Sequence, residues 1–210
     1  MSGPGRDCGP GNRSKNPSQS VRIIAGIYRG RPLASVGKGD PSAHLRPTTD
    51  RVRESLFNML DGGRFGAPFE GAHVLDLFAG TGALGLEAMS RGAGSAVFVD
   101  NGRKAVSLIK ANIDTLRCTN TRVIPKDATR LPKCDGDRAT LVFLDPPYGK
   151  NLGGRALQSA IQQGWLADDA LVVWEENAPQ SVPDGFRLLD TRRYGDTHVT
   201  VMRFGSQAGM

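Results

Sequence analysis

Short apolar runs alternate with segments of helical periodicity from about residue 73 to residue 204. The runs predict strands, because a strand covered on both faces is apolar throughout, and the periodic segments predict helices. Two further β-prone stretches flank Gly195-Asp196, which is a hairpin signal. The pattern predicts an α/β fold, with a doubly wound, mostly parallel sheet and a C-terminal antiparallel hairpin. The expected strands are 74–78, 96–99, 121–125, 141–144, 170–174, 186–194 and 198–204, and the expected helices are 83–91, 102–117 and 154–164.

The chain before residue 61 has a different pattern. Residues 1–20 are rich in Gly, Pro, Ser and Asn and have hardly an apolar side chain, so we expect a disordered tail. Residues 21–33 are β-prone with glycine breaks, which is typical of a hairpin or bulged pair. A helix follows, with Thr49 or Asp50 as a possible N-cap and Asp61-Gly62-Gly63 as its end. We therefore expect a small N-terminal hairpin-helix unit at 21–60 and a main domain at 61–210.

Length, charge and cysteine content narrow the class of protein. The 210 residues suffice for one domain with a full α/β core, and no apolar run is long enough to span a membrane. The N-terminus lacks the apolar segment that is typical of exported proteins. A net charge of +6 and a pI near 9.5 favour a polyanionic partner. Cys8, Cys118 and Cys134 lack metal-ligand spacing, so we expect reduced thiols, no metal site and a cytoplasmic location.

The most informative stretch is Leu141–Gly149, in which an apolar run leads into Asp145-Pro146-Pro147-Tyr148. Two prolines cannot continue a sheet ladder, so the strand ends there, at the edge where open α/β sheets bind ligands. Asp145 and the carbonyl of Pro146 can both accept hydrogen bonds from an exocyclic amine, and Tyr148 offers a face for a planar base. The group is typical of a clamp for an amine on an aromatic ring. The structural alternative is a simple turn that closes a strand.

A glycine turn follows the strand at 74–78. Gly80-Thr81-Gly82-Ala83-Leu84-Gly85 matches the dinucleotide fingerprint, but it fits S-adenosylmethionine equally well. Asp76, just before the glycines, favours the second cofactor, because a carboxylate attracts a cationic amino acid and repels a pyrophosphate. Asp100 follows the next strand, where an acid can hold both ribose hydroxyls. Asp127 follows the third and can meet the adenine amino group, or it is an ordinary surface turn.

Basic side chains gather in the N-terminal unit. Arg22, Arg29 and Arg31 lie on the predicted hairpin beside Tyr28, and such interleaving suits a phosphate backbone. An edge strand protected by charge is the alternative. A second group, Arg46, Arg51 and Arg53, surrounds the start of the following helix. Positive charge there is unfavourable for the helix dipole, which indicates an anion at this position in use.

These motifs together resemble the Class I S-adenosylmethionine-dependent amino-methyltransferases, which have a Rossmann-like sheet. The fuller set resembles the bacterial RsmD family, whose members methylate N2 of a guanine in small-subunit (16S) ribosomal RNA. It comprises Arg22-Ile-Ile-Ala-Gly26, Arg46-Pro-Thr-Thr-Asp-Arg-Val-Arg-Glu-Ser-Leu-Phe-Asn58, Asp76-Leu-Phe-Ala-Gly80-Thr-Gly82-Ala-Leu-Gly-Leu-Glu87, Asp145-Pro-Pro-Tyr148 and Tyr194-Gly-Asp196. The resemblance covers about residues 21–204.

The resemblance implies a role for particular residues. Asp145, Pro146 and Tyr148 would act on a flipped-out guanine. Residues Thr48, Asp76, Phe78, Gly80, Gly82, Asp100, Asn101, Asp127 and Ala128 would bind S-adenosyl-L-methionine. Residues Arg22, Arg29, Arg31, Arg46 and Arg51 would contact ribosomal RNA, within a small-subunit assembly particle. The protein would act as a monomer, without a metal ion and away from membranes.

Three rival functions differ from this one in a specific feature. A DNA or RNA adenine-N6 methyltransferase would use the same clamp, but the DNA enzymes normally need a further target-recognition segment. An NAD(P) oxidoreductase would use the glycine turn and has no need of Asp145-Pro146-Pro147-Tyr148. A non-catalytic RNA-binding module would need the basic hairpin alone.

Overall fold

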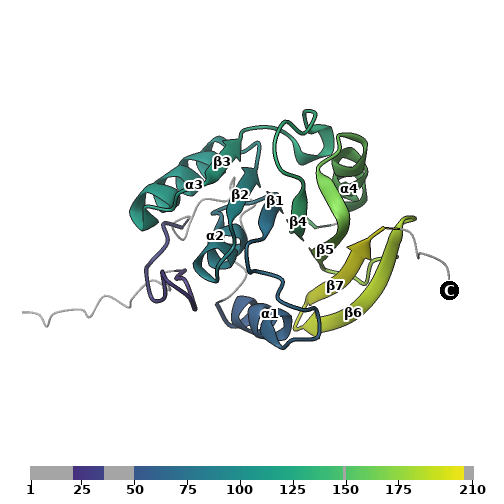
Figure 1. Ribbon diagram of the computed structural model, residues 1–210, viewed down its shortest axis with the longest axis horizontal. Coiled ribbons are helices and arrows are strands. Elements are labelled where there is room, and N and C mark those ends of the chain that lie inside the picture. The colour runs from purple at the N-terminus through teal and green to yellow at the C-terminus, as the bar shows by residue number, and fades with distance from the viewer. Residues whose placement is uncertain (1–20, 36–49, 149, 206–210) are drawn as a thin grey trace, which may run out of the picture.

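The computed structural model describes residues 21–35, 50–148 and 150–205 (Figure 1). The predicted tail at 1–20 and the predicted contacts of Arg46 and Thr48 lie outside these residues. In chain order the elements are α1 (Asp50–Asp61), β1 (His73–Leu77), α2 (Ala83–Ser90), β2 (Ser95–Val99), α3 (Arg103–Leu116), β3 (Thr121–Ile124), the 3₁₀ turn η1 (Ala128–Arg130), β4 (Ala139–Leu144), α4 (Leu152–Gln162), β5 (Leu166–Glu176), β6 (Phe186–Tyr194) and β7 (Thr197–Phe204).

One seven-stranded sheet organises the chain, in the order β3-β2-β1-β4-β5-β7-β6. The first five strands pair in parallel, and β7 pairs antiparallel with both β5 and β6. The predicted α/β sheet with a C-terminal antiparallel hairpin is therefore confirmed. Because β1 lies between β2 and β4, the carboxyl ends of three parallel strands meet at the centre of one sheet edge.

Helices cover both faces of the sheet, which explains why its central strands are apolar throughout. On one face, α1, α2 and α3 pack over a core that contains Phe98, Phe143 and Val173. On the other face, α4 and η1 pack over Val142, Leu144 and Trp174. Figure 1 shows α1 and α2 on the opposite side of the sheet from α4.

Residues 21–35 pack onto the first of these faces. Where a hairpin or bulged pair is expected, the chain forms a short antiparallel pairing, with a bridge from Arg22 to Pro32 and hydrogen bonds from the Leu33 N–H to the Val21 carbonyl at 2.7 Å and from the Ile23 N–H to the Arg31 carbonyl at 3.0 Å. Glu87 of α2 accepts hydrogen bonds from the backbone N–H groups of residues 24 and 25, at 2.7 and 3.0 Å. A Cβ on Gly26 would lie 1.8 Å from the Ser90 carbonyl oxygen, so only glycine allows this approach. The unit boundary near residue 60 remains a prediction.

The largest difference in element bounds concerns β5. The strand begins at Leu166, four residues before the predicted start, and its pairing with β4 is irregular between Ala139 and Leu141. Asp168 and Asp169 are exposed within it, and Asp169 has φ = 62°. Because these two exposed acids interrupt the apolar run, and the second has a left-handed conformation, the apolar pattern does not predict the first residues of the strand. No helix among the described residues has both the length and the apolar character needed to cross a membrane.

Candidate active site at the carboxyl edge of the sheet

The turn after β1 has an unusual backbone. Phe78, a non-glycine residue, has φ = 60°, and Gly80 and Gly82 have φ = 59° and 78°. Left-handed conformations at a bulky residue are strained and concentrate at functional sites. The turn is held by hydrogen bonds from the Ala79 N–H to the Val99 carbonyl at 3.0 Å and from the Gly82 N–H to the Ala79 carbonyl at 2.7 Å. The predicted nucleotide turn is thus a fixed structure that connects β1 to α2.

The third glycine of the motif serves packing. A Cβ on Gly85 would lie 2.5 Å from Cε1 of Phe98 and 3.0 Å from Oδ2 of Asp76, so α2 can approach the sheet only because this residue lacks a side chain. A Cβ on Gly82 would also point at the core, 3.4 Å from the Phe98 ring and 3.5 Å from both Ile109 and Leu86.

Asp76 and Asp100 are integrated into the turn. Asp76 is 1% exposed, and its Oδ2 accepts a hydrogen bond from the Gly85 N–H at 2.9 Å. Burial raises the pKa of Asp76 to about 7, and the charges of Asp145 and Asp100 act in the same direction. The Asp100 carboxylate accepts from the Gly80 N–H at 2.9 Å and the Gly102 N–H at 2.8 Å, and burial raises its pKa too. Both acids therefore also organise the backbone of the turn.

Asp127 has a similar local role. Its Oδ1 accepts from the N–H and the hydroxyl of Thr129, at 2.9 and 2.8 Å, and so caps η1. The adjacent Ala128 is buried, and Asn101, which follows Asp100, is exposed. These residues follow β3 and β2, on the same sheet edge as the glycine turn.

The clamp residues lie at the end of β4, next to the glycine turn. The Asp145 N–H donates to the carbonyl of Leu77, the last residue of β1, at 3.3 Å. Burial raises the pKa of Asp145 to about 7, and the charge of Glu176 adds to the effect. Pro146 is buried, and the Tyr148 hydroxyl lies 3.4 Å from Oγ1 of Thr197, the first residue of β7. The C-terminal hairpin therefore contacts the hydroxyl of Tyr148.

The end of β5 adds two acids to which the sequence pattern assigned no role. Glu175 is 1% exposed, and neither of its carboxylate oxygens has a hydrogen-bond partner among the described residues. Burial raises its pKa well above the ordinary value, the charges of Asp145 and Asp76 raise it further, and Arg53 lowers it. Glu176 accepts from the Asn177 N–H at 3.0 Å, and burial raises its pKa. Two consecutive acids at the end of an apolar strand were the available signal.

The basic residues divide into two groups. Arg22, Arg29, Arg31 and Arg51 are exposed, and Arg31 lies 6.0 Å from the centre of the Tyr28 ring. Arg53, in contrast, is 1% exposed and donates to the backbone carbonyl of Arg22. Arg53 of the second basic group therefore lies in the interior of the protein, and the hypothesis that an anion binds at the start of α1 stays a prediction. Helical periodicity turns Arg53 inward, and it connects α1 to the N-terminal segment.

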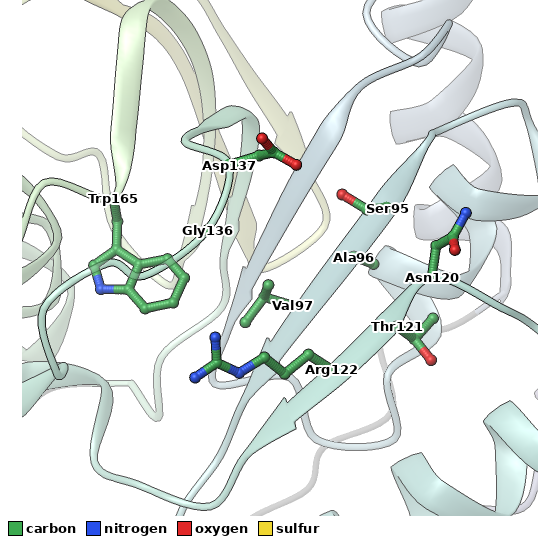
Figure 2. Close-up of a pocket in the computed structure, with 9 residues that line it drawn as sticks. All are labelled: Ser95, Ala96, Val97, Asn120, Thr121, Arg122, Gly136, Asp137 and Trp165. Carbon is green, nitrogen blue, oxygen red and sulfur yellow. The ribbon is translucent and has the colours of Figure 1, made fainter.

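A cavity of about 280 Å³ lies at the opposite edge of the sheet, near the amino ends of β2 and β3 (Figure 2). Ser95, Asn120 and Thr121 line one side of it, and Arg122, Asp137 and Trp165 line the other. None of the predicted site residues lines this cavity. Arg122 is held by an ion pair with Asp135. The chemistry-bearing residues are instead at the carboxyl edge, where α/β sheets bind ligands.

Comparison with known proteins places this site in a family. Residues 21–203 match the family model described as "Conserved hypothetical protein 95". The ribosomal RNA small subunit methyltransferase D of Escherichia coli K12 is 40% identical over 83% of this chain and 87% of its own length. Its namesake from Haemophilus influenzae is 35% identical over 87% of this chain and 93% of its own length.

The solved structures agree. The E. coli protein yhhF, described as a methyltransferase, superposes with a TM-score of 0.74 at 35% identity, covering 90% of this chain and 99% of that chain. The Class I methyltransferase fold expected from the motifs is thereby confirmed. The predicted family is confirmed as well, and the chain belongs to the family of the ribosomal RNA small subunit methyltransferases D.

Proposed function

We propose that this protein transfers a methyl group from S-adenosyl-L-methionine to the exocyclic N2 amine of a guanine in small-subunit (16S) ribosomal RNA. The observation that carries the proposal is the position of Asp145, at the end of β4 and hydrogen-bonded to the end of β1, beside the glycine turn. An acceptor for an amine thus stands next to a cofactor turn, in a chain of this family.

The residues at the carboxyl edge suit the cofactor. Asp76 lies next to the last residue of β1, and Asp100 and Asp145 directly follow β2 and β4. Such a cluster of acids, in a chain of net charge +6, favours a small cation over a phosphate. When bound, S-adenosyl-L-methionine supplies an activated methyl group on a sulfonium. We assign the ribose to Asp100 and Asn101, the adenine to Asp127 and Ala128, and the amino-acid end to Asp76, Phe78, Gly80, Gly82 and Thr48.

Asp145 and the Pro146 carbonyl orient the nucleophile in this proposal. An exocyclic amine is a poor nucleophile, because its lone pair is delocalised into the ring. Two acceptors that hold its hydrogens turn the lone pair out of the ring plane, towards the methyl group. Tyr148, steadied by Thr197, stacks on the flipped base. The contribution is therefore positioning and electrostatic stabilisation, without covalent catalysis by the protein.

The exposed arginines supply RNA affinity. Arg22, Arg29, Arg31 and Arg51 lie on the N-terminal segment and the start of α1, on the α1–α2 face of the sheet. We add Arg46 from the sequence pattern. Phosphate contacts of this kind position an enzyme without reading sequence. A small-subunit assembly particle in the cytoplasm is the proposed substrate, and a monomer the proposed active form.

Methyl transfer from tritiated cofactor to RNA tests the proposal. The acceptors are free ribosomal RNA and small-subunit particles from a strain that lacks the protein, and the modified base is then mapped. We expect N2-methylguanine at one position of 16S RNA, formed far more slowly by the Asp145→Ala variant. Label on adenine N6 would instead identify the rival methyltransferase, and calorimetric affinity for NAD equal to that for S-adenosylhomocysteine would reject both.

A further inference from the structure

Glu175 is the least satisfied polar side chain at the carboxyl edge. It is 1% exposed, and neither of its carboxylate oxygens accepts or donates a hydrogen bond within the described part of the chain. A buried carboxyl group without hydrogen bonds opposes folding, because it loses its contacts with water and gains none in return. An unsatisfied buried group of this kind needs an explanation, and a role in binding or catalysis is one that fits a position at the ligand-binding edge of the sheet.

The sheet register shows where this group lies. Trp174 pairs with Leu144, so Glu175 and Asp145 follow two paired residues on adjacent strands. Trp174 and Leu144 belong to the core under α4, and alternation puts the next residue of each strand on the opposite face, under α1. The charge of Asp145 accordingly raises the pKa of Glu175. The two carboxyl groups are thus neighbours on adjacent strands, and among the described residues no group of three or more His, Cys, Asp or Glu side chains could hold a metal ion.

The order of the strands assigns Glu175 to the substrate side. The proposed cofactor residues end β3, β2 and β1, and β4 lies between them and β5. Glu175 is therefore on the far side of Asp145 from the glycine turn. On that side the Tyr148 hydroxyl approaches Thr197 of β7, and β7 pairs with β5 at Glu175 and Val199. The base that is proposed to stack on Tyr148 is therefore the ligand nearest to Glu175.

We propose that Glu175 reads the N1–H and O6 of the target guanine while Asp145 holds its N2 amine. This inference rests on the proposed function and names the atoms that select its substrate. In guanine the N2 amine, N1–H and O6 form a continuous edge. A neutral carboxyl group matches the last two, since its carbonyl accepts from N1–H and its hydroxyl donates to O6. Burial beside Asp145 and Asp76 favours the neutral form, and together they outweigh the charge of Arg53 on α1, which acts in the opposite direction.

Adenine is the poorer fit for the same pair. Suppose that the N6 amine of adenine binds to Asp145 in place of the N2 amine of guanine. The next atom along the edge is then N1, an acceptor without a hydrogen, and the one after it is the C2–H group. Glu175 then makes one hydrogen bond where guanine gives two. A site built to hydrogen-bond a substrate rejects an analogue that lacks the matching groups, because the groups of the site are left unpaired. Glu175 would thus select guanine.

An RNA that carries 2-aminopurine at the mapped target position tests whether Glu175 recognises N1–H and O6 of guanine. This base keeps the reactive amine and lacks both N1–H and O6. In single turnovers with saturating cofactor, we expect the native enzyme to methylate guanine at least about tenfold faster than 2-aminopurine, about the value of one hydrogen bond. Glu175→Leu should slow guanine methylation and reduce the preference to within about threefold. Glu175→Gln, which keeps a carbonyl acceptor and an N–H donor, should retain most of it.

Stability separates this role from a structural one. Leu has a similar volume and removes an unsatisfied buried carboxyl, so Glu175→Leu should unfold at the same temperature as the native protein or higher. Its calorimetric affinity for S-adenosylhomocysteine should be unchanged. An unfolded Leu variant would show that the carboxyl supports the fold, and lost cofactor affinity would assign it to the cofactor. Either result overturns the inference.

The remaining outcomes separate the inference from the proposed function. If the native enzyme methylates no guanine in RNA or particles, the proposed function fails and the inference fails with it. If the native enzyme methylates guanine but shows no preference over 2-aminopurine, or if Glu175→Leu keeps the native preference, the inference alone is overturned.

Discussion

The two halves of the carboxyl edge use carboxyl groups in opposite ways. In the half formed by β1, β2 and β3, Asp76, Asp100 and Asp127 accept hydrogen bonds from nearby backbone N–H groups. In the half formed by β4 and β5, Glu175 has no partner among the described residues. Acids in the first half fix the shape of a turn before any ligand arrives. In the second half Glu176 accepts a hydrogen bond from the Asn177 N–H, but Glu175 leaves its acceptors open, which is costly for stability and useful for recognition.

The two halves also interact electrostatically. Burial raises the pKa of Asp76, Asp100, Asp145 and Glu175, so the edge holds protons that ordinary carboxyl groups would have lost. A cationic ligand would lower these pKa values again and release protons on binding. The two halves are therefore coupled through charge, although their hydrogen bonds are separate.

Removal of Asp145 should have the largest effect, and it should be a kinetic one. Asp145→Ala deletes the acceptor that orients the amine, so we expect the single-turnover rate at saturating RNA and cofactor to fall about 10²-fold or more. Asp145→Asn, which keeps one acceptor oxygen, should lose less. Affinity for S-adenosylhomocysteine, measured by calorimetry, should stay close to native. A near-native rate for the Ala variant would contradict the clamp.

A side chain at Gly85 should disrupt the first half by packing. The Cβ of Gly85→Ala would lie 2.5 Å from the Phe98 ring, so the helix must shift or the ring must rotate. Overpacking of this kind costs about 1–3 kcal/mol of unfolding free energy, measured by urea denaturation. Gly136→Ala is the matched control, because a Cβ there meets nothing within 4 Å. Equal stability of the two variants would show that α2 is not held against β2 at this residue.

Asp76 should make the stability of the protein depend on pH. The ordinary pKa of Asp76 is 3.8 and its folded value is about 7, so between these values the folded protein holds a proton that the unfolded chain has lost. The stabilisation by this proton is complete below about pH 4 and is lost as the pH rises to about 7. Asp76→Asn should therefore flatten the fall of unfolding free energy across that window, by at most about 1.4 kcal/mol per pH unit.

The neighbouring acids with raised pKa values also make stability fall with pH, in the native protein and in Asp76→Asn alike. The contribution of Asp76 is therefore the difference between the two proteins. Asn keeps an acceptor for the Gly85 N–H, so the variant should retain the turn. Denaturation curves at several pH values, for the native protein and for Asp76→Asn, measure the difference in slope. Parallel curves would mean that Asp76 is ionised in the folded protein.

The sequence predicted the sheet because apolar runs report burial directly, and it predicted Asp145 because two prolines fix the end of a strand. It gave Glu175 no role, since an acid at a strand end looks like a surface residue until the register brings it beside Asp145. It also did not predict that Arg53 is buried against the N-terminal segment, since a group of charges at a helix start does not tell which side chain turns inward. Both failures concern pairings between distant parts of the chain, which no local pattern contains.

We expect the smallest effect from the loss of one exposed arginine of the N-terminal segment, which is proposed to contact RNA phosphates away from the end of β4 and β5. Arg29 is exposed, and its removal should weaken RNA binding without slowing methyl transfer at saturation. The slope of log affinity against log salt concentration should become shallower by roughly 0.7–0.9, the value of one phosphate contact. Arg155→Ala removes the same charge from α4, on the other face of the sheet, and should leave the slope unchanged. An equal change in both variants would mean that RNA responds to net charge alone, and that the α1–α2 face is no special surface.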